Sequence, residues 1–164
     1  MNITLIGMMG SGKSTIGKLL AEKLNLKFYD TDEEIIKLTN YSINQIFEEF
    51  SEQTFRTMET IVLAKILNLD NQVIATGGGI IKRKENQELL KDTTTIYLKA
   101  DNETLLERVK NDNSRPLLNN KNLFLTIQTI LYEREPLYEQ SKIIVDTTNK
   151  TPDEVVNEII EKIK

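Results

Sequence analysis

The chain begins with a group of residues that could hold phosphate. Residues 7–14 read GMMGSGKS, which fits the pattern G-x-x-x-x-G-K-[ST] between a predicted strand and a predicted helix. Glycines let backbone N–H groups turn toward phosphate oxygens at the positive end of the following helix. Lys13 could reach the β- and γ-phosphates of a nucleoside triphosphate, and Ser14 could offer its hydroxyl to Mg²⁺. A glycine-rich turn that only caps a helix is the alternative, but the complete pattern in this context favours a phosphate-binding loop.

The phosphate pattern alone does not separate kinases from GTPases or motor ATPases. A guanine-recognition sequence of the form N-K-x-D is missing, since residues 148–151 read TNKT and lack the aspartate. The sequence therefore favours a kinase or an ATPase over a GTPase.

Two aspartates follow the second predicted strand. Asp30 and Asp32 lie in YDTDEEI, and side-chain alternation would place both carboxylates on one side of an extended segment. One could then hold magnesium through water while the other meets a substrate hydroxyl. The alternative is an aspartate that caps a helix whose first turn carries Glu33 and Glu34. Both interpretations remain open from the sequence.

The segment FRTMETIV places a charged residue where an apolar one is expected. Glu59 shares a predicted helix face with Phe55 and Val62, and Arg56 lies three residues before it. A structural ion pair would explain the two charges. A second interpretation is that Glu59 orients Arg56, whose guanidinium then binds a substrate carboxylate through two hydrogen bonds.

Three consecutive glycines, residues 77–79, follow the third predicted strand. Glycines allow a ligand to approach the backbone closely, and free N–H groups there could bind it. A tight strand-to-helix turn is the alternative, although it does not need three glycines.

Two later segments carry further arginines. The asparagine-rich residues 111–122 contain Arg115 and predict a lid, with a plain surface loop as the alternative. The segment LYEREPLYEQS carries Arg134 and Tyr138 on a predicted helix, in which Pro136 is expected to bend or end a turn. By itself, Arg134 could equally be an ordinary solvated helix residue.

These candidate residues are connected by alternating strands and helices. Short β-branched runs predict five strands, at Asn2–Ile6, Lys27–Tyr29, Gln72–Ala75, Thr95–Ala100 and Lys142–Asp146. Helical spacing of apolar residues between them indicates an α/β protein with a parallel sheet covered on both faces. Ligands bind at the carboxyl ends of the strands in such sheets, and the phosphate pattern, the two aspartates and the triple glycine each follow a predicted strand.

Helix starts are also encoded. Ser42 and Gln45 form a capping-box pattern ahead of a helix that extends through Phe50. Thr151 and Glu154 form another around Pro152, which is suited to the first helical position.

Composition narrows the chemistry. The 164 residues include no cysteine and no histidine, which excludes disulfides, thiolate nucleophiles, the usual zinc sites and histidine bases. General acid–base catalysis would therefore depend on Asp, Glu, Lys or Tyr side chains. The net charge of −4, the absence of a long apolar run and the start in a strand pattern predict a cytoplasmic protein that binds neither nucleic acid nor membrane. No coiled-coil heptad demands a partner, so a monomer is expected.

Taken together, these segments resemble shikimate kinases. GMMGSGKSTIG, DTD, FRxxE, GGG, RPLL and REPLY occur here in the order and spacing of that family, over essentially the whole chain. The resemblance implies ATP-dependent phosphorylation of the 3-hydroxyl of shikimate in aromatic amino-acid biosynthesis. It also implies one domain, residues 1–164, with the three-layer α/β/α P-loop fold of nucleoside monophosphate kinases. That fold has a five-stranded parallel sheet, a lid near residues 111–122 and substrate-binding helices.

The resemblance assigns residue roles. The ATP-binding set is Gly10, Ser11, Gly12, Lys13, Ser14, Thr15, Arg108 and Arg115. The shikimate-binding set is Asp32, Arg56, Glu59, Gly77, Gly78, Gly79 and Arg134, with ring walls at Ile43, Phe47, Phe55, Pro116 and Leu117. Ser14 and Asp30 would serve Mg²⁺. The catalytic residues would be Lys13, Asp32 and Arg115.

Two other functions compete with this one. A gluconate kinase also needs a site for a carboxylate and hydroxyls, although the Arg56–Glu59 pair with the triple glycine favours shikimate. A non-catalytic ATP-binding regulator would not need the acceptor residues Asp32 and Arg134.

Overall fold

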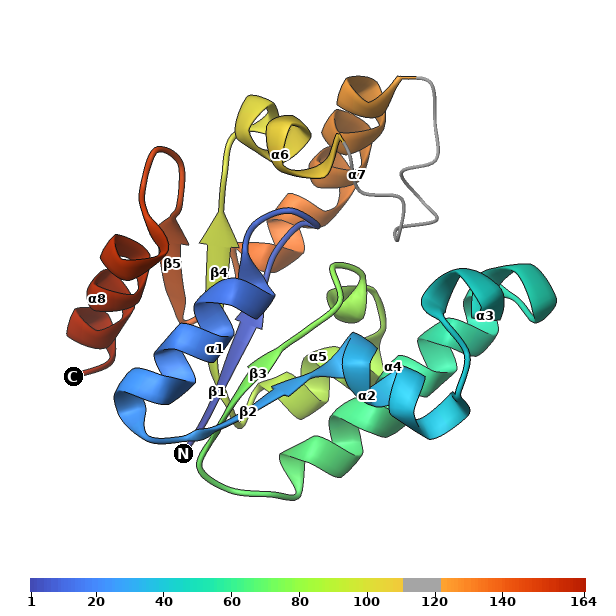
Figure 1. Cartoon of the computed structure of the whole chain (residues 1–164), viewed down its shortest axis with the longest axis horizontal. Coiled ribbons are helices and arrows are strands. Elements are labelled where there is room, and N and C mark those ends of the chain that lie inside the picture. Colours follow the sequence, from blue (N-terminus) through green and yellow to red (C-terminus); the bar gives the residue numbers. More distant parts are fainter. Residues whose placement is uncertain (111–121) are drawn as a thin grey trace.

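The computed structural model describes residues 1–110 and 122–164. Five parallel strands form one sheet in the order β2-β3-β1-β4-β5 (Figure 1). They are β1 Asn2–Ile6, β2 Lys27–Asp30, β3 Gln72–Ala75, β4 Thr94–Lys99 and β5 Ile143–Asp146. The predicted parallel sheet is confirmed, and each strand begins and ends within a residue of its predicted range.

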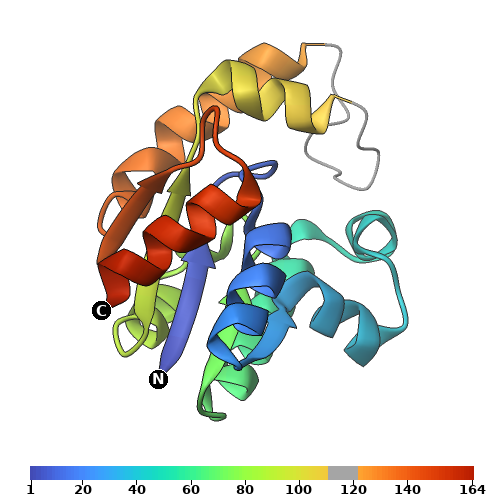
Figure 2. The same ribbon diagram turned by 60° about the vertical axis from the view of Figure 1, so that its left-hand side comes forward.

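Helices cover both faces of the sheet (Figures 1 and 2). Helices α1 (Lys13–Leu24) and α8 (Pro152–Ile163) pack on one face, where Ile16 and Val156 meet Leu5 of the central strand. On the other face α4 (Glu52–Leu67), α5 (Lys84–Leu90) and α7 (Leu123–Tyr138) pack around Tyr97 of β4. The result is the predicted three-layer α/β/α arrangement.

Smaller helices extend the molecule beyond the carboxyl ends of the strands. Helices α2 (Thr31–Thr39) and α3 (Ile43–Glu49) join α4 in a separate apolar cluster that includes Ile35, Ile46 and Phe55. Helix α6 (Asn102–Val109) packs beside α7, and the short 3-10 helix η1 (Ile80–Lys82) follows the triple glycine. These elements surround the edge of the sheet where ligands are expected.

The predicted helix starts are confirmed. Ser42 and Gln45 exchange both hydrogen bonds of a capping box, with N–O distances of 3.1 and 2.8 Å. Thr151 and Glu154 do the same at 3.2 and 2.7 Å, and Pro152 is the first residue of α8. Each box satisfies N–H groups that a helix end leaves free.

Of the two interpretations of Asp30 and Asp32, the helix cap is confirmed and the extended segment is wrong. Asp30 ends β2 and also caps α2, since its carboxylate accepts hydrogen bonds from the N–H groups of Asp32 and Glu33 at 2.9 and 3.4 Å. Asp32 therefore lies in the first helical turn. No connecting loop separates β2 from α2, because Asp30 is both the last residue of the strand and the N-cap of the helix.

Helix α7 continues through Pro136 and ends at Tyr138. Pro136 lacks a backbone N–H, and its position in the last turn limits the loss to one hydrogen bond near the helix end. Among the described residues, no helix has both the length and the apolar character needed to span a membrane.

Candidate active site

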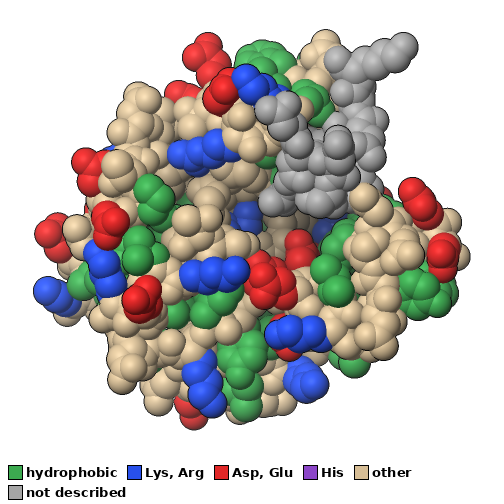
Figure 3. All heavy atoms as spheres, viewed as in Figure 1, with side chains coloured by type: hydrophobic (Ala, Val, Ile, Leu, Met, Phe, Trp, Pro, Cys, Tyr) green, Lys and Arg blue, Asp and Glu red, His purple; other side chains and the backbone are tan. Residues whose placement is uncertain are grey.

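Two neighbouring cavities open at the carboxyl ends of the strands. The first, of 470 Å³, follows the loop between β1 and α1 and the segment after β5. The second, of 280 Å³, lies among α2, α3, α4, α7 and the triple glycine. Asp32 and Gly77 line both cavities, so a group bound in one can meet a group bound in the other. Figure 3 shows the hollowed centre of this face, with acidic and basic side chains inside it.

The first cavity is built mainly from backbone. Gly10 and Gly12 adopt φ values of 79° and 93°, which side-chain-bearing residues rarely adopt. Helix α1 starts after Gly12 with no side chain bonded to its first N–H groups and no acidic residue in its first turn. The positive end of the helix dipole therefore faces the cavity, as in anion-binding helix starts.

Lys13 adds a full positive charge to this loop. It is 8% exposed, and its Nζ donates hydrogen bonds to the carbonyls of Gly7 and Met8, both at 2.8 Å. These carbonyls hold the ammonium group inside the loop. A buried cation among inward-turned N–H groups favours binding of a polyanion.

Ser14 and Asp30 bring a hydroxyl and a carboxylate together. Ser14 Oγ donates to Asp30 Oδ2 at 2.5 Å, and Asp30 is 8% exposed. Oxygen ligands suit Mg²⁺, which at phosphate-transfer sites takes one or two side chains and completes its shell with water and phosphate. Across the described ranges no cluster of three or more metal-ligating side chains occurs. The pair fits a magnesium ion that binds with a nucleotide rather than a dedicated metal cage.

Arg108 connects two walls of the first cavity. Its guanidinium donates to the carbonyl of Gly10 at 3.2 Å and to the hydroxyl and carbonyl of Thr147 at 3.2 and 3.3 Å. Sequence reasoning missed Thr147. Its position directly after β5, at the same sheet edge as the phosphate loop, is the signal that could have identified it.

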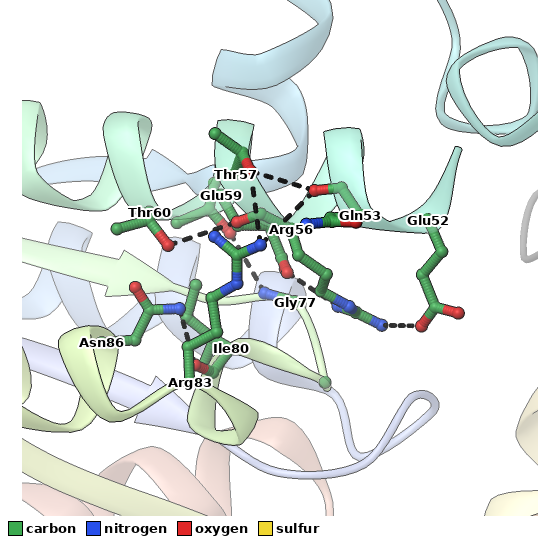
Figure 4. Close-up of polar contacts among 12 residues, drawn as sticks. Glu52, Gln53, Arg56, Thr57, Glu59, Thr60, Gly77, Ile80, Arg83 and Asn86 are labelled. Atoms are coloured by element: carbon green, nitrogen blue, oxygen red, sulfur yellow. Dashed lines mark hydrogen bonds and ion pairs between the residues drawn. The ribbon is translucent and has the colours of Figure 1, made fainter. Parts of the chain in front are cut away.

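The second cavity contains a buried ion pair on α4 (Figure 4). Glu59 is fully buried, and its Oε1 accepts a hydrogen bond from Arg56 Nη1 at 2.7 Å, as the spacing predicted. Burial raises the pKa of the Glu59 carboxyl, and the Arg56 guanidinium only partly opposes this rise. Glu59 therefore holds one edge of the guanidinium in a low-dielectric site.

Arg56 also contacts a second carboxylate. Its Nη2 lies 3.3 Å from Oε1 of Glu52, which is far more exposed than Glu59 (Figure 4). The Nε of Arg56 is buried and has no hydrogen-bond partner within the described part of the chain. The guanidinium thus has one donor that no described residue uses.

The triple glycine lets both arginines approach the backbone. A Cβ on Gly78 would lie 3.2 Å from Nη1 of Arg134, and a Cβ on Gly79 would overlap the guanidinium of Arg56. Arg134 is 4% exposed and projects from α7. Two guanidinium groups therefore lie beside the N–H groups of one loop, an arrangement suited to a carboxylate.

The first glycine of this loop accommodates the acidic residues. A Cβ on Gly77 would lie 2.6 Å from Oε2 of Glu59 and 3.1 Å from Oδ1 of Asp32. The N–H of Gly77 donates to Thr31 Oγ1 at 3.1 Å. This close packing brings Asp32 to the boundary between the cavities.

The cavity linings collect most of the residues predicted from sequence. The first cavity is lined by Gly10, Ser11, Gly12, Lys13, Ser14, Thr15, Asp30 and Arg108. The second is lined by Asp32, Arg56, Glu59, Gly77, Gly78, Gly79, Arg134, Ile43, Phe47 and Phe55. The predicted lid residue Arg115 and the wall residues Pro116 and Leu117 lie outside the described residues. Asn122, the last residue of the predicted lid, caps α7 through Leu125 N at 3.1 Å. Sequence reasoning missed Met9, Ile36 and Thr76, which also line the cavities.

Comparison with known proteins identifies the family. A family model described as shikimate kinase matches residues 9–164. This chain belongs to the shikimate kinase family. It is 44% identical to a shikimate kinase of Caldicellulosiruptor bescii over 160 residues, covering 97% of this chain and 93% of that relative. A shikimate kinase of Acinetobacter baumannii, solved in complex with shikimate, superposes with a TM-score of 0.97 at 38% identity, covering 99% of this chain and 92% of the other.

A gluconokinase structure tests the competing assignment. The enzyme from Sinorhizobium meliloti matches with a TM-score of 0.66 and 19% identity, over 98% of this chain and 89% of that one. At that identity the likeness establishes a common fold only. The alternative of a gluconate kinase is therefore less well supported than a shikimate kinase.

Proposed function

We propose that this chain transfers the γ-phosphoryl group of ATP to the 3-hydroxyl of shikimate, giving shikimate 3-phosphate and ADP. The observation that carries the proposal is a second cavity that contains the buried Arg134 and the partly buried Arg56 and that shares Asp32 and Gly77 with the first, phosphate-loop cavity. Membership of the shikimate kinase family supports the same reaction, which belongs to aromatic amino-acid biosynthesis.

On the nucleotide side, the phosphate loop binds ATP through backbone N–H groups and the Lys13 ammonium group. Phosphoryl transfer depends mainly on positioning and on neutralising charge that spreads over the γ-phosphoryl oxygens. Lys13 supplies part of that neutralisation, and Arg115 supplies more from the lid. Arg108 packs against the adenine while it holds Gly10 and Thr147 together. The ATP-binding residues are Gly10, Ser11, Gly12, Lys13, Ser14, Thr15, Arg108 and Arg115.

Magnesium is the cofactor that this arrangement fits. Ser14 and Asp30 would hold it through their oxygens, directly or through water. When bound there, magnesium would supply positive charge that offsets the negative charge of the phosphate groups.

On the acceptor side, Arg56 and Arg134 bind the shikimate carboxylate together with the N–H groups of Gly78 and Gly79. Bidentate guanidinium contacts fix both the position and the orientation of such a group. Ile43, Phe47 and Phe55 contact the ring. Hydrophobic walls with a few converging polar groups are typical of small-molecule sites.

Asp32 orients the attacking hydroxyl and accepts its proton. The carboxylate lies where the two cavities meet, and the chain contains no histidine that could serve as a base. Closure of residues 111–122 would exclude water, which otherwise competes as the phosphoryl acceptor.

We further propose that the chain acts as a single-domain monomer in the cytoplasm.

The proposal is tested by measuring ADP release with ATP and Mg²⁺ in the presence of shikimate, gluconate or no acceptor. Saturable stimulation by shikimate alone is the expected result. Stimulation by gluconate alone would assign the cavity to another kinase. If the protein binds ATP but neither acid stimulates ADP release, the alternative of a non-catalytic ATP-binding regulator would be favoured.

A further inference from the structure

Tyr138 is a buried tyrosine whose hydroxyl reaches the triple-glycine loop. It has no exposed surface, and its hydroxyl donates to the carbonyl of Gly78 at 2.5 Å across 60 positions of sequence. Its ring stacks on Tyr97 with centroids 5.0 Å apart and an interplanar angle of 23°. A buried tyrosine hydroxyl needs a partner. Here that partner is the carbonyl of Gly78, in the loop that lines the second cavity. We call this cavity the acceptor cavity, because the proposed function places the phosphoryl acceptor there.

The geometry of one peptide unit links this hydrogen bond to the cavity. The carbonyl of Gly78 and the N–H of Gly79 belong to the same peptide, which is planar and trans. In such a unit the C=O and N–H bonds point in opposite directions. When the Tyr138 hydroxyl holds the carbonyl on the side of α7, the N–H of Gly79 is directed to the opposite side.

The loop needs such anchors because glycines leave its backbone free to adopt many conformations. The N–H of Gly77 is fixed by Thr31, and the carbonyl of Ile80 accepts from Asn86 Nδ2 at 2.8 Å (Figure 4). These bonds fix the two ends of the loop. The Tyr138 hydroxyl fixes the peptide between Gly78 and Gly79, in the middle.

The same helix carries Arg134 one turn before Tyr138, so both side chains project from one face of α7. Nη1 of Arg134 lies 3.2 Å from the position of a Cβ on Gly78. Burial raises the pKa of the Tyr138 hydroxyl to about 12, although the Arg134 guanidinium opposes the rise. The hydroxyl therefore keeps its proton at neutral pH and remains a donor.

We propose that Tyr138 is a positioning residue for the carboxylate of the acceptor. Its hydroxyl holds the Gly78–Gly79 peptide so that the Gly79 N–H and the Arg134 guanidinium bind the same anion. The residue touches neither substrate nor nucleotide, and it acts through the loop. This inference rests on the proposed function, because the anion is the carboxylate of shikimate.

The test compares Tyr138→Phe with two matched variants. Tyr97→Phe removes the hydroxyl from the other ring of the stacked, buried pair, and Tyr132→Phe removes it from an 84% exposed position on α7. KM for shikimate, KM for ATP, kcat and Tm are measured for each. We expect Tyr138→Phe to raise KM for shikimate about tenfold, the effect of losing one well-placed hydrogen bond. KM for ATP and kcat should stay within about twofold of wild type, as should all constants of both controls.

Each other outcome overturns a defined claim. Unchanged KM for shikimate in Tyr138→Phe, or an equal rise in Tyr97→Phe, would overturn the positioning role. So would a parallel rise in both KM values with a lower Tm, since that is the behaviour of a general packing defect. Both constants come from the same sample, so their ratio does not depend on the folded fraction. Failure of the wild-type protein to turn over shikimate would instead refute the proposed function.

Discussion

The two cavities are built in different ways. The first cavity, the phosphate cavity, is built mainly on one continuous segment, in which a glycine-rich turn and a helix start present backbone N–H groups around the buried Lys13. Asp30, Arg108 and Thr147 complete its walls. The acceptor cavity is assembled from side chains on α2, α4 and α7 and from a loop after β3. We therefore expect phosphate to be bound by local backbone geometry, and the acceptor to be bound by charges that only the complete fold brings together.

The two cavities also differ in how they stabilise buried charge. Lys13 is held by neutral carbonyls of its own loop. Arg56 is held between the carboxylates of Glu52 and Glu59, one exposed and one buried. We therefore expect substitutions in the first cavity to lower kcat. Substitutions in the second cavity should raise KM for shikimate and leave KM for ATP unchanged.

Lys13→Ala should cause the largest loss. Removal of a cation from developing phosphoryl charge is expected to lower kcat at least about 100-fold. Lys18→Ala is the matched control on the same helix, because Lys18 lines neither cavity. It forms an exposed ion pair with Glu33 at 3.6 Å and lies over the Phe28 ring, 5.8 Å from its centroid. Steady-state ADP release measures both variants. Equal rates for Lys13→Ala and Lys18→Ala would refute a role for the phosphate loop in transfer.

Gly79→Ala should act on the acceptor cavity alone. The new methyl group would overlap the guanidinium of Arg56, which Glu59 holds in place. Displacement of this guanidinium is expected to raise KM for shikimate about 30-fold, the effect of losing a charge-assisted hydrogen bond. KM for ATP should not change. A similar rise in KM for ATP would show that the two cavities are not independent.

Glu59→Gln should reveal the buried carboxyl through the pH dependence of stability. Burial raises the pKa of Glu59 above its ordinary value of 4.5, so the folded protein holds this proton more tightly than the unfolded chain. As pH rises from about 4.5 through the raised pKa, wild type should lose stability relative to Glu59→Gln. Urea unfolding of both proteins across this range measures the difference. A difference that does not vary with pH would contradict the raised pKa.

Glu52→Ala should have the smallest effect. Glu52 accepts a hydrogen bond from Arg56 Nη2 at 3.3 Å, so its removal leaves this donor available to the substrate carboxylate. KM for shikimate should fall by about threefold at most, because exposed ion pairs are weak. The effect should shrink at high salt. Glu49→Ala, which removes an exposed carboxylate from α3, controls for the change in net charge. A rise in KM would indicate that Glu52 orients Arg56 rather than competing with the substrate.

Sequence reasoning predicted the features that depend on local pattern. The strands followed from β-branched runs, the starts of α3 and α8 from capping residues, and the Arg56–Glu59 pair from a charge on an apolar helix face. Helix α5 was missed because it is short and Arg83 provides no side-chain cap. The helix cap at Asp30 was only one of two open interpretations, because the sequence pattern does not show that strand and helix share that residue.

Contacts between distant residues could not be predicted in the same way. Arg108 meets Thr147 across 39 positions, and neither residue belongs to a periodic pattern that indicates the other. The hydrogen bond from Tyr138 to Gly78 likewise depends on how α7 packs against the loop after β3. Glycine identity suggested close approach to this loop, but only the fold specifies that Arg134 and Arg56 are the side chains that approach.

The two cavities adjoin, and we expect them to bind their ligands separately. The most direct test is to measure the binding of ATP and of shikimate to the Arg134→Ala variant by calorimetry. Arg134 is buried at the acceptor cavity and does not line the phosphate cavity. Loss of a buried charge partner predicts shikimate binding weakened about 100-fold or more, with the Kd for ATP within about twofold of wild type. Weakened ATP binding with shikimate binding intact would contradict the account.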